Sequence, residues 1–188
     1  MASAGAMNQK VQVLQLSHDE TANAYIWQPL YTAWAAAELD TKSNLFSAVG
    51  IGARGVTFTM WANAKLTLFR AIRWNGAFCF LTSILPAGDG LHSTVQAALC
   101  SPVTCQKDPD AEIPGYLFPG ILTEKYLGHE QMDPMAVTTT TLVLVVPKEI
   151  TLDVGHLARC GTINYEVQVA HTLDEYKNEY EISRRADV

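Results

Sequence analysis

Apolar and polar residues alternate along much of this chain with the period of a β-strand. In GTINYEVQV, residues 161–169, the apolar side consists of Ile163, Tyr165, Val167 and Val169. A period of two with one apolar face predicts a half-buried strand. The same alternation predicts strands at 54–62 and 65–74, and a further strand-like stretch opens the chain at 10–17.

Other stretches depart from simple alternation. GAFCFLTSIL, residues 76–85, is a nearly continuous apolar run that predicts a strand buried on both faces, and TTTTLVLVVP, residues 138–147, is the most β-prone stretch of the chain. A short helix is predicted at 91–100, and the Ala-rich residues 31–40 and residues 43–50 are candidates for a second one. Residues 107–120 hold three prolines and two glycines, which predict a long irregular connection.

These elements predict an all-β fold. Seven or eight strands, one or two short helices and no βαβ unit are typical of an eight-stranded antiparallel jelly-roll sandwich. No linker-like stretch divides the chain, so we expect a single domain over 1–173, followed by a polar tail over 174–188. No internal repeat is visible in the sequence, which disfavours propellers and solenoids.

Composition narrows the function classes. Charged residues make up 17% of the chain, against about 25% in a typical soluble domain. This deficit fits either a well-buried β protein or a subunit that covers its surface with copies of itself. The net charge of −6 disfavours a simple duplex-binding module. We expect a cytosolic chain without a membrane partner, because no signal peptide or apolar membrane span is evident.

Candidate catalytic and metal-binding motifs are weak, and we predict no enzyme, no metal and no cofactor. The five histidines include no H-x-H pair of the cupin type, and no G-x-S-x-G motif is present. The four cysteines form no C-x-x-C pair, which favours free buried thiols. The clearest charge feature is a basic group that would face phosphates if its members shared a surface: Arg54, Lys65, Arg70 and Arg73. The alternative is scattered charge that protects strand edges.

The order of motifs resembles the coat proteins of small icosahedral plant RNA viruses, and tymovirus coat proteins look closest. The similarity rests on an opening β-segment with an acidic turn, VQVLQLSHDETANAYI, and on NLFSAVGIGARGVTFTMWANA. It also rests on FCFLTSILPAGDGLHSTVQAAL and on the strand GTINYEVQV near the C-terminus. Comovirus- and cheravirus-like coat domains share this general pattern.

The resemblance implies a jelly-roll capsid subunit that self-assembles into an icosahedral shell around single-stranded RNA. Its partners would be other copies of itself and genomic RNA, bound without a basic arm. It would reside in the virion, and in the host cytoplasm before assembly. Trp27, Trp34 and Met132 are candidate contact residues. The alternative function is a cupin- or lectin-like jelly-roll binding protein or enzyme.

Overall fold

The fold is all-β in the part of the chain that the structure describes. The computed structural model describes residues 7–40, 54–130 and 137–185. They form twelve strands and no helix. The strands pair antiparallel, apart from a single parallel bridge between Ala24 and Leu117. The predicted all-β, antiparallel class is therefore confirmed.

The described residues divide into two compact units, where the sequence predicts one domain. The first unit holds residues 7–18, 26–40 and 54–101, and the second holds 19–25, 102–130 and 137–185.

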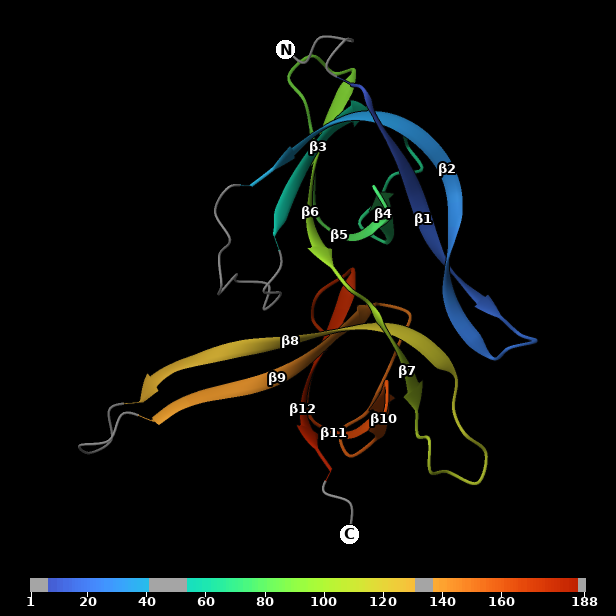
Figure 1. Ribbon diagram of the computed structural model, residues 1–188, viewed down its shortest axis with the longest axis vertical. Helices are drawn as coiled ribbons and strands as arrows, with labels where there is room; N and C mark the ends of the chain where they lie inside the picture. Colours follow the sequence, from blue (N-terminus) through green and yellow to red (C-terminus); the bar gives the residue numbers. More distant parts are fainter. Residues whose placement is uncertain (1–6, 41–53, 131–136, 186–188) are drawn as a thin grey trace. The chain divides into compact units, whose positions relative to one another are not determined.

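The first unit is a closed six-stranded barrel, which we call barrel 1 (Figure 1). Its strands are β1 (Gln9–Asp19), β2 (Ala24–Leu39), β3 (Gly55–Trp61), β4 (Arg70–Trp74), β5 (Ala77–Pro86) and β6 (His92–Cys100). The end of β1 and the start of β2, within residues 19–25, belong to the second unit. They pair in the order β1-β4-β5-β6-β3-β2, and β2 returns to β1. Alternate residues of these strands fill the interior, among them Val11, Val13, Phe58, Met60, Ile72 and Val95.

The second unit is also a closed six-stranded ring, which we call barrel 2. Its strands are β7 (Val103–Lys107), β8 (Leu117–Glu130), β9 (Val137–Pro147), β10 (Leu157–Cys160), β11 (Ile163–His171) and β12 (Lys177–Arg184). They pair in the order β7-β10-β11-β12-β9-β8, and β8 returns to β7. Beyond the ring, β8 and β9 continue side by side as a two-stranded ribbon (Figure 1).

The two barrels repeat one topology. When the strands of each unit are counted from one to six, both rings read 1-4-5-6-3-2. Equivalent hairpins also share turn chemistry. Asp89 accepts hydrogen bonds from the backbone N–H groups of Leu91 and His92 between the fifth and sixth strands of barrel 1. Asp174 accepts the corresponding bonds from Tyr176 and Lys177 in barrel 2. The repeat is therefore a repeat of pairing order and turns, not of visible sequence.

Two predicted helices are strands, and the jelly-roll sandwich is not confirmed. Residues 31–40 lie largely in β2, and 91–100 largely in β6. Alanine favours helices locally, but here it supplies the small side chains that fit between larger neighbours. Ala35 is buried opposite Met60, and Ala97 is buried opposite Val56. The helix predicted at 43–50 lies outside the described residues.

The C-terminal region differs from its prediction in two respects. A register shift between Val167 and Val169 interrupts the alternation of β11. Val167 is buried, whereas Val169 lies on the outer face and is 41% exposed, because a bulge displaces the following side chains to the other side. The predicted polar tail contains β12, whose Tyr180 is fully buried. Residues 177–184 are therefore part of barrel 2.

Replacement of Tyr180 by Phe should destabilise the protein. The Tyr180 hydroxyl donates to the Ile150 carbonyl at 3.2 Å and accepts from the Leu152 N–H at 3.0 Å. Tyr180→Phe leaves both buried backbone groups without this partner, at a cost of about 1–3 kcal/mol. Urea unfolding followed by circular dichroism measures the loss. The control is Tyr176→Phe, at the residue just before β12. Its free energy of unfolding is expected to lie within about 0.5 kcal/mol of that of the parent. Equal stabilities of the two variants would contradict this role for β12.

Candidate functional site

Four large apolar residues lie exposed near one end of barrel 1. Trp34 on β2, Trp61 on β3, Leu85 on β5 and Leu91 in the β5–β6 turn are 56, 54, 55 and 59% exposed. Their neighbours Ala35 and Met60 point into the barrel, so Trp34 and Trp61 point outward. Single exposed apolar residues are ordinary, but the strand register brings these four toward one end of the barrel, which makes them a candidate interaction surface. We call these four residues the tryptophan patch.

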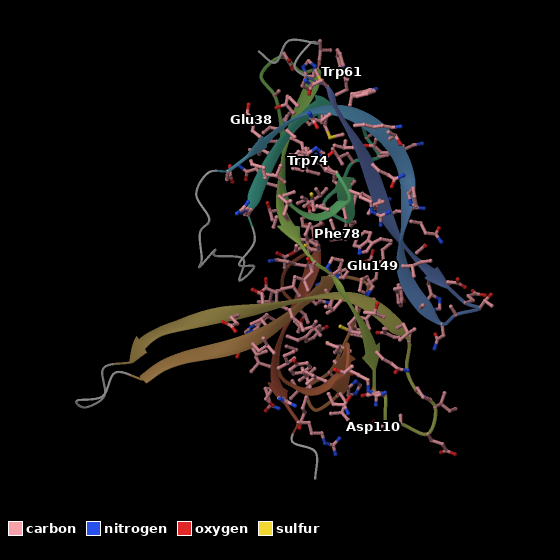
Figure 2. All side chains as sticks on the ribbon, in the orientation of Figure 1. Glu38, Trp61, Trp74, Phe78, Asp110 and Glu149 are labelled. Carbon is pink, nitrogen blue, oxygen red and sulfur yellow. The ribbon has the colours of Figure 1, made fainter. Side chains whose placement is uncertain are left out.

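The β5–β6 turn holds the centre of the tryptophan patch in place. His92 pairs with Trp61 across the β3–β6 ladder, and their ring centroids lie 4.4 Å apart. The other side of the His92 ring is fixed by Asp89, whose Oδ2 lies 2.5 Å from Nδ1. The Leu91 carbonyl accepts a hydrogen bond from the Ala62 N–H at 2.9 Å. Figure 2 shows Trp61 at the end of this barrel and Trp74 within its ring.

The predicted contact residues fall in different surroundings. Trp34 belongs to the tryptophan patch, whereas Trp27 is half-buried and packs against Phe78 with ring centroids 5.5 Å apart. Met132 lies outside the described residues. The sequence therefore identifies one member of the patch. The others come from different strands and a turn, and only the β3–β6 and β5–β6 pairings bring them together.

The basic group predicted from the sequence does not share one face. Arg70 and Arg73 are three residues apart on β4, so their side chains point to opposite sides of the strand. Arg73 is exposed, whereas Arg70 lies on the same side as buried Ile72. Both Arg70 Nε and the Tyr31 hydroxyl are buried and lack a hydrogen-bond partner among the described residues. Burial raises the pKa of Tyr31, and the Arg70 charge opposes this effect.

The remaining two basic residues lie at opposite ends of β3. Arg54 precedes this strand and Lys65 follows it, and both are exposed. An exposed cation that the sequence prediction omits lies near Arg73 in the sheet. Lys10 lies on the outward side of β1, two residues from Gln12, which pairs with Arg73. The spacing of cations along the sequence does not reveal that Lys10 and Arg73 are neighbours, because only the pairing of β1 with β4 brings them together.

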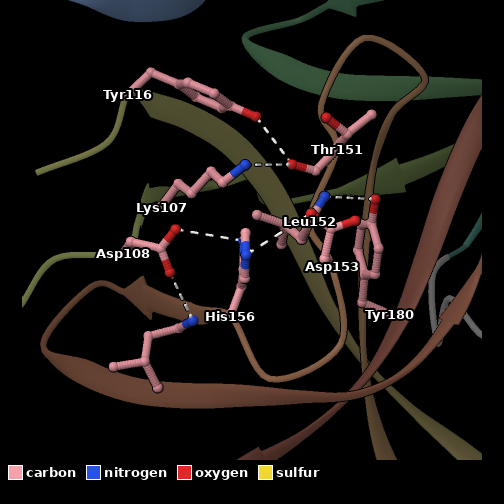
Figure 3. A network of polar contacts seen from close by, with 9 residues as sticks. Lys107, Asp108, Tyr116, Thr151, Leu152, Asp153, His156 and Tyr180 are labelled. Carbon is pink, nitrogen blue, oxygen red and sulfur yellow. Dashed lines mark hydrogen bonds and ion pairs between the residues drawn. The ribbon is translucent and has the colours of Figure 1, made fainter. Parts of the chain in front are cut away.

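Barrel 2 carries a polar network (Figure 3), and Asp108 of this network also lines an open hollow. Asp108 Oδ1 accepts the Leu157 N–H at 3.0 Å, and Asp108 Oδ2 lies 3.4 Å from His156 Nδ1. On its far side, His156 Nε2 lies 3.7 Å from Asp153. Lys107 Nζ and the Tyr116 hydroxyl both donate to the Thr151 carbonyl. These bonds tie the β7–β8 and β9–β10 connections together, which is a structural role.

The hollow itself holds about 600 Å³ and is lined by Asp108, Asp110, Ala111, Gly155, Leu157, Glu166 and Arg185. Two arginines lie against one of its carboxylates, that of Asp110. Arg159 donates to Asp110 at 3.0 Å, and Arg185 lies 4.0 Å from the other Asp110 oxygen. Among the described residues, no group of three or more His, Cys, Asp or Glu side chains is arranged to hold a metal ion.

No family model matches this chain, and no curated protein matches it. In the part of the chain that the structure describes, no helix is long and apolar enough to cross a membrane. The resemblance to plant-virus coat proteins and the contact of the basic group with RNA both stay predictions.

Loss of the Asp89 carboxylate should weaken the turn beneath the tryptophan patch in a pH-dependent way. Hydrogen bonds from His92 and from the Leu91 and His92 N–H groups lower the pKa of Asp89 to about 2. A lowered folded-state pKa means that this stabilisation is complete above the ordinary value of 3.8 and is lost as the pH falls toward 2. Asp89→Asn should therefore melt at lower temperature than the parent at pH 6, with a smaller difference at pH 2.

Thermal melts at pH 6 and pH 2, together with tryptophan emission, test this expectation. Asp174→Asn, at the equivalent turn of barrel 2, is the control and should leave the tryptophan emission unchanged, because all four tryptophans lie in the first unit. A pH-independent difference between Asp89→Asn and the parent would contradict the ionic role of Asp89.

Proposed function

We propose that this protein is a structural, non-enzymatic subunit that self-assembles, and that its assembly is the icosahedral coat of a small RNA virus. The observation that carries the proposal is the tryptophan patch. Trp is among the residues most enriched in the energetic centres of protein interfaces. An apolar patch of this kind on a folded barrel is suited to burial against another protein surface.

A second copy of the chain is the occupant that fits best. The chain has a charged fraction of only 17%, and interface cores are depleted of charged residues. Copies that each carry a net charge of −6 repel one another at long range. Contact must then be driven by apolar burial, and salt that screens the repulsion should favour it. Assembly through this patch needs no jelly-roll sandwich, because a shell requires complementary surfaces that close.

The genome partner in this proposal is single-stranded RNA, bound weakly and without a basic arm. Exposed cations on the inner surface of a shell would neutralise part of its phosphate charge. Arg73, with Lys10 beside it on the outward face of β1 and β4, is the best placed of the described cations. Arg70 is the least suitable of the predicted group, because it is half-buried beside Tyr31. The virion, with the host cytoplasm before assembly, is the proposed location.

Replacement of Trp61 by Glu should abolish assembly. The substitution places a charge at the centre of the tryptophan patch, where a buried unpaired carboxylate is strongly unfavourable. Size-exclusion chromatography with light scattering should show large particles for the parent, favoured by added salt, and small species for Trp61→Glu. The control Leu173→Glu changes an exposed leucine that lies in barrel 2, and it should assemble like the parent.

Circular dichroism must show that Trp61→Glu keeps its strand content. A parent that stays monomeric across salt and pH would refute assembly as the function. Unchanged particles from Trp61→Glu would instead refute the patch as the contact.

Reversal of the paired cations on β1 and β4 should lower the RNA content of particles. Lys10→Glu/Arg73→Glu changes two charges on one face, whereas Arg54→Glu/Lys65→Glu changes two charges at opposite ends of β3. Each phosphate contact contributes to binding through counterion release, and neighbouring cations act on the same stretch of RNA. The ratio of absorbance at 260 and 280 nm should therefore fall further for the first pair. Equal ratios in both variants and the parent would exclude RNA contact by these cations.

A further inference from the structure

Two cysteines face each other inside barrel 2. Cys105 on β7 and Cys160 on β10 are directly opposite in the antiparallel ladder, and their Sγ atoms lie 2.8 Å apart. Both thiols are buried and free. The sequence predicts free buried thiols, but their positions 55 residues apart give no sign that they meet.

The hydrogen-bond pattern around the pair suits a bond between the two sulfur atoms. Gly161 N–H donates to the Thr104 carbonyl, and Asp108 N–H donates to the Leu157 carbonyl. Hydrogen-bonded and non-hydrogen-bonded pairs alternate along an antiparallel ladder. Cys105 and Cys160 therefore form a non-hydrogen-bonded pair, in which the Cα atoms approach to about 4.5 Å. This separation falls within the range of about 4.4–6.8 Å found for disulfides.

The neighbouring strand makes room for these side chains. A Cβ atom on Gly120 of β8 would lie 3.0 Å from Cys105 Sγ and 2.6 Å from Leu144 Cδ1.

The other two cysteines offer no such pairing. Cys79 points into barrel 1, whereas Cys100 pairs with Phe78, the residue before Cys79 and on the opposite face of β5. Burial raises the pKa of Cys79 to about 11 and that of Cys100 to about 12.

We propose that Cys105 and Cys160 form a reversible cross-strand disulfide that locks β7 to β10 when the protein meets a disulfide oxidant such as glutathione disulfide. One cysteine thiolate attacks the oxidant and releases one glutathione thiolate. The second cysteine thiolate attacks the resulting mixed disulfide, forms the Cys105–Cys160 bond and releases the second glutathione. The two cysteines lose two electrons and two protons in total, and the oxidant becomes two glutathione molecules.

The bond would close a loop that contains β8 and β9, and this restricts the unfolded chain. The hydrogen bond to Cys160, and then burial, raise the pKa of Cys105. Burial also keeps the oxidant away, so the reaction requires local opening or takes place during folding. Oxidised protein should melt about 5–10 °C above reduced protein.

The test uses the full chain with Cys79→Ala/Cys100→Ala, which retains only the proposed pair. The variant is unfolded in urea and refolded with glutathione disulfide, and its thiols are then counted under denaturing conditions. We expect no free thiol, a mass lower by two hydrogen atoms and a melting temperature that falls on addition of dithiothreitol. The matched control Cys105→Ala/Cys160→Ala should show no redox-dependent shift in melting temperature.

Two retained thiols, or one glutathione adduct on each cysteine, would overturn the proposal. If the loss of Cys79 from the core of barrel 1 prevents folding, the wild-type chain provides the second measurement. Peptide mapping of the oxidised wild type should then find Cys160 joined to Cys105. A bond from Cys160 to Cys79 or Cys100, or no bond at all, would equally overturn it. The result of the disulfide test does not depend on capsid assembly, because formation of the Cys105–Cys160 bond requires only the folded ring of barrel 2.

Discussion

Closure of each six-stranded ring by backbone hydrogen bonds is the constraint on which this structure depends. An open sheet would leave unpaired N–H and C=O groups along its two edge strands, and closure removes those edges. The ring needs all six strands, so no strand is an accessory. This explains why the C-terminal segment that looks polar in sequence is a strand. β12 lies between β11 and β9, and without it barrel 2 would be open.

The turns set the pairing of strands that follow one another in the chain. Asn75 and Gly76 both have positive φ between β4 and β5, as a tight two-residue hairpin requires. Between β10 and β11, Gly161 supplies the positive φ, at +62°. Asp89 and Asp174 then close the hairpin between the fifth and sixth strands of each ring with the same pair of backbone bonds. The two rings thus share turn chemistry at this hairpin as well as pairing order.

The sequence predicts strands well where one face is apolar, and poorly where side chains are small. The alternation at 54–62 and the apolar run at 76–85 became β3 and β5. Residues 31–40 and 91–100 were missed because alanine has a high local helix propensity, and only pairing with large neighbours makes it suitable for a strand. The repeat was missed because it consists of pairing order, which no local pattern contains.

The same distinction explains the candidate sites. Cations spaced closely in sequence looked like a patch, but Arg70 and Arg73 occupy opposite sides of β4. The tryptophan patch and the Cys105–Cys160 pair each join residues from separate strands, so only the register of the ladder reveals them. Local spacing is therefore a sound guide to the type of an element and a weak guide to which side chains meet.

The tryptophan patch lies on the outer face of barrel 1, so its side chains do not contribute to the barrel interior. Apolar residues inside the ring stabilise the barrel to which they belong, whereas Trp61 points away from that interior and remains more than half exposed. Its ring is nevertheless held by His92, which Asp89 fixes in turn. The exposed part of the Trp61 ring adds nothing to the apolar burial that stabilises barrel 1. A large apolar side chain exposed to solvent gains stabilisation when another surface covers it, and this is the physical basis for the proposal that this end of barrel 1 mediates assembly.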